Sequence, residues 1–226
     1  MSIRSVVSFV CFVLFASLAQ AASISVSPIR VDVPAPASSA SVTLRNEAAL
    51  PVNIQIRIFK WVLKDGDDFY EETESVVATP PVATVPPGGS ALVRIVRTDN
   101  RPVVGEEPYR LIVDEIPDAN RVRNVGVNVA LRYAIPVFFR NGDASQPKLA
   151  WSIRTVSGKR MLVATNTGDK SSRIANLNLD KTSLYKGLAG YALGQSTRMW
   201  PLPAKARGAR VTAESDNGPI DAPLSR

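Results

Sequence analysis

The nucleophilic and metal-binding residue types set narrow limits on the chemistry of this chain. Its 226 residues include no histidine, and its single cysteine, Cys11, lies in an apolar run near the N-terminus. Ser–His and Cys–His nucleophiles, thiolate metal sites and a disulfide framework are therefore excluded. Neighbouring acids such as Glu71 and Glu72 are too close in sequence to oppose each other across a sugar. We predict a protein that is not an enzyme and needs no cofactor.

Arg30 is the first residue that could act by binding. It follows Ile29 and precedes Val31 in a β-rich run. A guanidinium can bond a carboxylate through two parallel hydrogen bonds, which suits it to hold an anionic group. The residue types alone fit an exposed strand arginine equally well.

A row of aliphatic side chains is the second candidate for binding. Val125, Val127, Val129 and Leu131 alternate with smaller or polar residues at the start of a long β-rich run that ends at Phe139. Each such side chain contributes about 1.5 to 3 kcal/mol when it is fully buried. The row either covers the protein's own core or is offered to another protein by strand addition. The pattern leaves both readings open.

These residues lie in a chain whose pattern predicts an all-β fold. From Ser23 onward, short β-rich runs alternate with Pro, Gly, Asn and Asp, and no segment keeps a 3.6-residue apolar period. The expected strands are Ser25 to Val33, Ala40 to Asn46, Val52 to Val62, Ala91 to Arg97, Tyr109 to Ile116, Val125 to Phe139, Leu149 to Val156, Arg160 to Asn166, Ser172 to Leu179 and Arg207 to Ala213.

The N-terminal residues predict export. Arg4 precedes an apolar run from Val6 to Leu18, and Ala19-Gln20-Ala21 forms a small-residue cleavage triplet. We therefore expect residues 1–21 to be a signal peptide. The run is shorter than the roughly 20 residues that cross a bilayer, so we expect no membrane insertion. The formal charge of +7 is spread along the chain without basic tracts, and nucleic acid is a poor partner for an exported protein.

The rest of the chain has room for two sandwiches of about 100 residues each. The run Asn141 to Pro147 interrupts the strand pattern and carries no large apolar residue, which is typical of a linker. We expect one immunoglobulin-like domain over residues 22–141 and a second over residues 142–226.

Three motifs carry a family resemblance. The stretch Ala78 to Ile95, ATPPVATVPPGGSALVRI, resembles the A-T-P-P…P-G…V-R-[LI] signature of the PapD-like periplasmic pilus chaperones. The segments Tyr109 to Pro117 and Ala134 to Arg140 are similar to two further motifs of that family and follow in the same order. The second half of the chain matches more weakly. The resemblance implies two immunoglobulin-like sandwiches set at an angle, and a nucleotide-independent chaperone in the periplasm.

In this family the long strand before the domain junction lends alternating aliphatic side chains to a pilin that lacks its seventh strand. The resemblance puts these positions on Val125, Val127, Val129 and Leu131, which form the donor strand. It implies pilus subunits and an outer-membrane usher as partners, and it leaves room for self-association of the free chaperone.

The resemblance also implies roles for charged residues. Arg30 matches an arginine that binds the terminal carboxylate of the pilin. The family's second cation falls on Pro136, which carries no charge, so Arg132 and Arg110 are the weaker candidates for that contact. Glu106, Arg140 and Asp216 match a charge network that ties the two domains together.

The alternative function is that of a secreted structural or carbohydrate-binding β-sandwich, which would share the signal and the strand pattern. Trp61, Trp151 and Trp200 are dispersed along the chain, which favours core or junction positions over a sugar platform.

Overall fold

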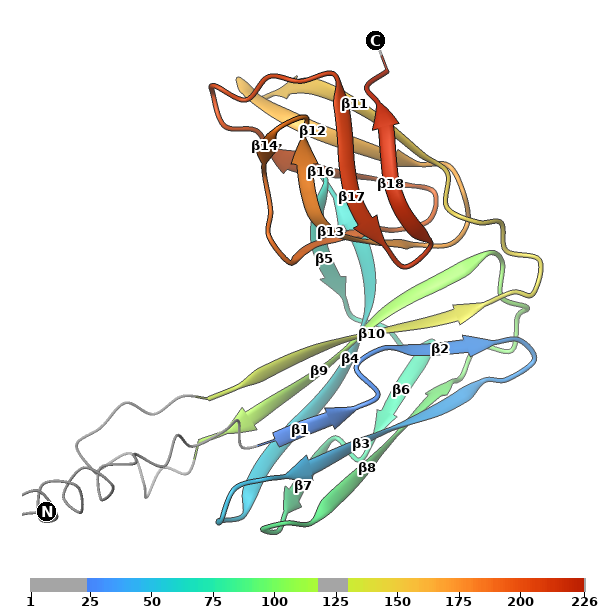
Figure 1. The fold of residues 1–226 in the computed structure, drawn as a ribbon. Coiled ribbons are helices and arrows are strands. Elements are labelled where there is room, and N and C mark those ends of the chain that lie inside the picture. Colours follow the sequence, from blue (N-terminus) through green and yellow to red (C-terminus); the bar gives the residue numbers. More distant parts are fainter. Residues whose placement is uncertain (1–23, 118–129, 226) are drawn as a thin grey trace, which may run out of the picture.

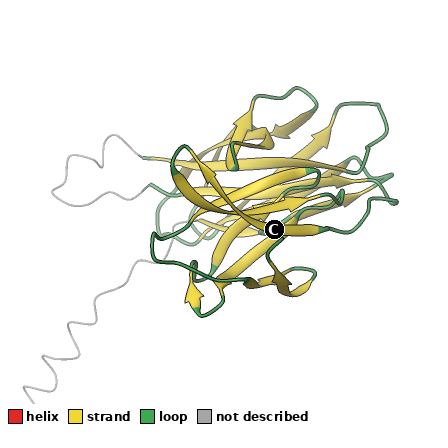
Figure 2. Ribbon diagram, turned by 90° about the horizontal axis from the view of Figure 1, so that it is seen from above, coloured by secondary structure: helices red, strands yellow, loops and turns green. Residues whose placement is uncertain are grey.

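The computed structural model describes residues 24–117 and 130–225, and within them the chain consists of strands and loops (Figure 2). In these residues no helix is long and apolar enough to cross a membrane. The strands fall into two groups, before and after residues 141–148, and no sheet takes strands from both groups. Figure 1 shows the two groups meeting at an angle. The predicted all-β fold with two immunoglobulin-like sandwiches is confirmed.

The first sandwich has two sheets that enclose an aliphatic core. The cross-strand order in one sheet is β1 (Ile24–Ser27), β3 (Ser39–Asn46), β8 (Ser90–Arg97) and β6 (Val76–Thr79). The other runs β2 (Val31–Pro34), β10 (Arg132–Arg140), β9 (Glu106–Ile116), β4 (Val52–Lys64) and β5 (Asp67–Glu71), and β7 (Val82–Val85) also pairs with β4. In the first half of β4 alternate residues point inward, and Val52, Ile54 and Ile56 are buried in this core.

The second sandwich is built around stacked tryptophans. One sheet has the order β11 (Leu149–Val156), β12 (Lys159–Asn166) and β16 (Ser196–Pro201). The other has the order β14 (Thr182–Ser183), β13 (Ser172–Leu179), β17 (Arg210–Ser215) and β18 (Gly218–Pro223), and β15 (Leu188–Ala192) also pairs with β13. Trp151 and Trp200 lie in its core with ring centroids 5.7 Å apart.

The structure divides one predicted strand in two and describes only part of another. The expected single strand from Ser25 to Val33 is wrong, because β1 and β2 belong to different sheets. Pro28 lies between them, and a proline cannot donate to a strand ladder. Of the expected long strand ending at Phe139, the structure describes β10 from Arg132 onward. The donor-strand positions Val125, Val127 and Val129 lie outside the described residues, and the domain boundary after Asn141 stays a prediction.

A long hairpin of the first sandwich reaches the second. β4 continues beyond its pairing with β9, and the β4–β5 hairpin lies against the second sandwich in Figure 1. At its tip, Asp65 and Gly66 both have positive φ, 52° and 83°, as a two-residue hairpin turn of type I′ requires. The Gly66 carbonyl accepts a hydrogen bond of 3.2 Å from the N–H of Met199 in β16.

Behind this hairpin, a small buried cluster joins the two sandwiches. Trp61 and Phe138 come from the first sandwich, and Tyr191 and Leu193 come from the second. The Trp61 ring meets the Tyr191 ring edge-on at 5.2 Å, and Phe138 lies 6.1 Å from both rings. Aromatic pairs at such distances stabilise a contact beyond the area they bury.

We predict that Gly66→Ala weakens this junction. A Cβ at Gly66 would lie 2.4 Å from Cγ of Met199, and the residue also has a positive φ. Gly158→Ala is the matched control, because Gly158 has φ +75° and a Cβ added there would meet nothing within 4 Å. The strain of the left-handed backbone should cost both variants about 1 to 2 kcal/mol.

Gly66→Ala should lose about 1 to 3 kcal/mol more, because the added methyl overpacks the contact with Met199. Denaturant unfolding of the two variants and the wild type measures the difference. Equal losses in the two variants would contradict a tight contact between Gly66 and Met199.

Candidate functional site

Arg30 lies in the turn between β1 and β2, where the chain crosses from one sheet to the other. Its Nε donates to Oδ2 of Asp32 at 2.9 Å, and its terminal nitrogens reach Oδ1 of Asp32 at 3.3 Å and Oδ2 of Asp216. Burial disfavours the charged guanidinium, but the bonds to Asp216 and Asp32 outweigh it and raise the pKa of Arg30 above its ordinary value. Arg30 therefore stays positively charged, and its guanidinium is held in place by two carboxylates.

Arg140, at the end of β10, forms a second charged contact. Its Nε donates to Glu106 at 2.5 Å, and Nη1 pairs with Asp32 at 2.7 Å. The Glu106 side chain is only 1% exposed, and its other oxygen accepts the N–H of Ser171 in the second sandwich at 2.8 Å. Glu106 thus receives one donor from each sandwich, which restricts how the two can move apart.

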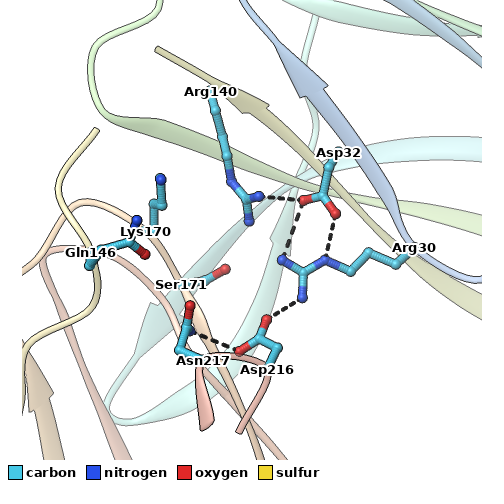
Figure 3. Close-up of a pocket in the computed structure, with 8 residues that line it drawn as sticks. All are labelled: Arg30, Asp32, Arg140, Gln146, Lys170, Ser171, Asp216 and Asn217. Carbon is cyan, nitrogen blue, oxygen red and sulfur yellow. Dashed lines mark hydrogen bonds and ion pairs between the residues drawn. The ribbon is translucent and has the colours of Figure 1, made fainter. Parts of the chain in front are cut away.

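Asp32 and Asp216 complete a chain of charges across the junction (Figure 3). Asp32 contacts both Arg30 and Arg140, while Asp216 comes from the loop between β17 and β18 and contacts Arg30. The structure therefore brings Glu106, Arg140 and Asp216 into one network, but Asp216 joins it through Arg30 and Asp32 rather than through Arg140. The role of these three residues in fixing the domains stays a prediction.

The guanidinium groups of Arg30 and Arg140 both lie over the aromatic ring of Phe138. The Arg30 guanidinium lies 4.9 Å from the ring centroid and the Arg140 guanidinium lies 5.2 Å from it. A cation over an aromatic face is attracted by the ring quadrupole. Phe138 therefore links the charge network to the buried cluster behind it.

This network borders a cavity of about 410 Å³ between the two sandwiches. Arg30, Asp32 and Arg140 line it from the first sandwich. The lining residues that follow Asn141 in the chain are Gln146, Lys170, Ser171, Asp216 and Asn217 (Figure 3). The cavity is polar and carries cations on several sides, so it is suited to bind a small anionic group.

The two weaker anchor candidates do not line this cavity. Arg132 is 66% exposed and pairs with Asp114 at 2.5 Å. Arg110 is buried with its guanidinium 3.6 Å from the Trp61 ring centroid, and it donates to the carbonyl of Ala134 at 3.0 Å. Burial lowers the pKa of Arg110 below its ordinary value. Arg110 belongs to the packing of the domain junction, and Arg132 belongs to the surface of β10.

The N-terminal half of β10 forms a second feature of the site. β9 pairs with β10 along its whole length, from Arg132 to Arg140, while β2 pairs only with Val137 to Arg140. Among the described strands, none pairs with Arg132 to Pro136 on the side away from β9. Leu131 directly precedes this segment, is half-buried, and accepts the N–H of Glu115 at 3.0 Å. An unpaired edge of this kind is a template for another strand.

Sequence reasoning missed five of the residues that line the cavity, and two of these, Asp32 and Lys170, are charged. The sequence signal for Asp32 is its place two residues after Arg30 in a run that predicts one strand, where such residues would share a face. In the structure the two side chains meet although Arg30 lies in the turn before β2. Lys170 lies in the loop between β12 and β13 of the second sandwich. Its position beside Arg140 depends on how the two sandwiches meet, so the sequence held no signal for it.

We predict that Asp216→Asn lowers the stability of the folded chain. The amide oxygen can still accept the Arg173 N–H, which lies 3.0 Å from Asp216, but the ion pair with Arg30 is lost. The loss should be about 1 to 2 kcal/mol, because both side chains are largely shielded from water. Denaturant unfolding provides the measurement.

Asp221→Asn is the control for this change. Asp221 pairs with Arg210 inside the second sandwich, and both side chains are more than half exposed. We expect little change in stability from it. If the two variants unfold alike, the Arg30–Asp216 pair does not stabilise the domain junction.

Comparison with known protein families gives a match over the first sandwich. The family described as "Pili and flagellar-assembly chaperone, PapD N-terminal domain" matches residues 23–142, which is more than half of the chain. No curated protein matches the chain.

Solved structures resemble both sandwiches together. A structure of the CsuC–CsuE chaperone–tip adhesion subunit complex from the archaic Csu pili of Acinetobacter baumannii matches with 28% identity and a TM-score of 0.75, covering 89% of this chain and 96% of the matched one. The E. coli chaperone DraB matches with 22% identity and a TM-score of 0.64, covering 90% and 97%. The Pseudomonas aeruginosa CupB2 chaperone matches with 22% identity and a TM-score of 0.56, covering 87% and 97%.

The family match extends over all strands of the first sandwich, from β1 to β10, including the arginine turn and the half-open strand that border the cavity. The chain therefore belongs to the family of pili and flagellar-assembly chaperones.

Proposed function

We propose that this protein is a periplasmic chaperone that holds a pilus subunit by lending it a strand and then delivers it to an outer-membrane usher. The similar structure from Acinetobacter baumannii is a complex of a chaperone with a tip adhesion subunit, which supports a pilus subunit as the partner. The signal expected in residues 1–21 supports export. No nucleotide is needed, because one strand is exchanged for another.

The observation that carries this proposal is the half-open edge of β10. Residues Arg132 to Pro136 pair with β9 on one side, and no described strand pairs with them on the other. A subunit that lacks a strand has unpaired backbone groups of its own, and burying such groups without partners is costly. Pairing the two edges would satisfy both sets of groups.

The side-chain parity of β10 supports Val125, Val127, Val129 and Leu131 as the donor residues. Tyr133, Ile135, Val137 and Phe139 point into or pack against the core of the first sandwich. Side chains two apart in a strand lie on the same face, so an extended chain before β10 would continue this row with the four aliphatic residues. We propose that this continuation fills the groove of the subunit.

The alternative, a carbohydrate-binding or purely structural sandwich, has less support. Trp61, Trp151 and Trp200 are each at most 2% exposed, which confirms their expected core and junction positions and leaves none of them as a sugar platform. Self-association of the free chaperone through the same strand stays a prediction.

We predict that Val129→Asp and Leu131→Asp each abolish retention of a subunit encoded next to this protein. Placing a carboxylate in an apolar groove without a partner costs several kcal/mol. Recovery of the co-expressed subunit should therefore fall at least about tenfold. Affinity purification of the chaperone from periplasmic extracts measures the recovered subunit.

Leu188→Asp serves as the control, because Leu188 is an exposed aliphatic residue, 55% accessible, on the second sandwich. Circular dichroism should show that all three variants are folded. Wild-type recovery with both folded variants would refute the donor-strand assignment. Failure of the unaltered protein to retain any subunit would refute the proposed function itself.

A second prediction concerns Arg30 as the anchor for the subunit's terminal carboxylate. Arg30→Ala should lower subunit recovery by about tenfold, since a hydrogen-bonded charge pair contributes about 1.5 to 3 kcal/mol. Asp216→Asn breaks the same interdomain ion pair but keeps the guanidinium, so it separates loss of the anchor from loosening of the junction.

Arg94→Ala controls for the loss of one exposed arginine elsewhere in the first sandwich. Subunit recovery should stay close to the wild-type level for Arg94→Ala, and it should fall clearly less for Asp216→Asn than for Arg30→Ala. If Arg30→Ala and Asp216→Asn lower recovery equally, Arg30 acts on the junction and not on the subunit.

A further inference from the structure

Lys170 differs from the other charged residues that line the cavity beside Arg30. Those neighbours are paired, since Asp32 contacts both Arg30 and Arg140 and Asp216 contacts Arg30. Within residues 24–117 and 130–225, the Lys170 ammonium makes no hydrogen bond or ion pair, although it lines the cavity. The side chain is half-buried, so water screens its charge less than it would on an open surface.

The backbone of Lys170 is held in place. Its N–H donates to the carbonyl of Ser145 at 3.1 Å, and its own carbonyl accepts the side-chain amide of Asn166 at 2.8 Å. Asn166 is itself buried at the end of β12. The second sandwich therefore presents the ammonium from a fixed point of the loop, which lowers the entropy lost when an anion binds there.

Arg30 retains donors that can face the same ligand. A guanidinium has five N–H groups, and three of them are used by Asp32 and Asp216. In Figure 3 the terminal nitrogens of Arg30 turn toward the side of the cavity on which Lys170 lies. Two N–H groups of Arg30 therefore stay available for a ligand carboxylate, which need not displace Asp32.

The ion pairs around the cavity leave out the Lys170 ammonium. Arg30 is paired with Asp32 and Asp216, and Arg140 is paired with Asp32 and Glu106. Among the described residues that line the cavity, Lys170 is thus the one cation that contacts no carboxylate. A ligand carboxylate would supply that ion pair, whereas an amide or a cation would not.

We infer that Lys170 supplies the second cationic contact for the terminal carboxylate of the client subunit, together with Arg30. This inference rests on the proposed function. It assigns to the second sandwich the charge that Pro136 of β10 cannot provide. The carboxylate is then held from both sandwiches, so client binding depends on the angle between them.

The test uses the full chain and a synthetic peptide with the carboxy-terminal sequence of the co-purified subunit, prepared as the free acid and as the amide. The wild type should bind the acid more tightly than the amide. Lys170→Gln should weaken binding of the acid by about tenfold and leave binding of the amide unchanged, since one charge-assisted bond is lost. Lys170→Arg should restore the preference for the acid. Fluorescence anisotropy measures both affinities.

Lys181→Gln is the matched control. Lys181 is an exposed lysine of the second sandwich outside the cavity, so this variant lowers the net charge equally and should bind like the wild type. Thermal unfolding of Lys170→Gln should match the wild type, because within the described residues the ammonium has no partner whose loss would weaken the fold.

Two results would overturn the inference. The first is an undiminished preference for the acid in Lys170→Gln, and the second is a wild type that does not distinguish acid from amide. Both can occur in a protein that still retains the whole subunit, and the proposed function would then stand. A wild type that retains no subunit would instead overturn the proposed function.

Discussion

The contact of one carboxylate, Asp32, with two arginines is the interaction on which the junction of this protein depends. Arg30 and Arg140 lie over the same ring, Phe138, and their like charges would repel without an acid between them. With Asp32 in place, each arginine is free to reach a further acid, Asp216 or Glu106. The four residues that Asp32 links in this network are at least partly withdrawn from water, so desolvation offsets much of the attraction, but any geometry that leaves a charge unpaired is penalised. We interpret the network as fixing the angle between the sandwiches.

β10 imposes the second constraint. One face of the strand contributes Ile135, Val137 and Phe139 to the first core, and the other face contributes Phe138 to the junction. Its edge is divided at Pro136, because β2 begins to pair at Val137. A proline has no N–H to offer, so it suits the boundary between an edge that is already paired and one left for a partner. The same strand thus belongs to the core, the junction and the proposed client site.

Much of this arrangement could be predicted from local patterns. The strands Leu149 to Val156 and Ser172 to Leu179 occur with the expected bounds, since alternation of apolar residues is a local signal. The break at Pro28 was missed because an apolar alternation on both sides of it resembles one continuous strand. Short strands such as β14 and β15 have too few residues to carry a pattern and depend on pairing with β13. Arg110 could equally be a surface or a buried residue from its neighbours alone, and the aromatic cluster of the junction decides that it is buried.

Residue types and motifs within short segments are enough to specify the fold class, the lack of histidine and cysteine chemistry after the expected signal, and the family. The pairing of the charges depends on the packing of the whole chain. Arg30 and Asp216 are 186 positions apart, and Glu106 and Ser171 are 65 apart, and no local pattern relates residues at such distances. The meeting of Arg30 and Lys170 at one cavity likewise exists only because the two sandwiches pack against each other through side chains from both.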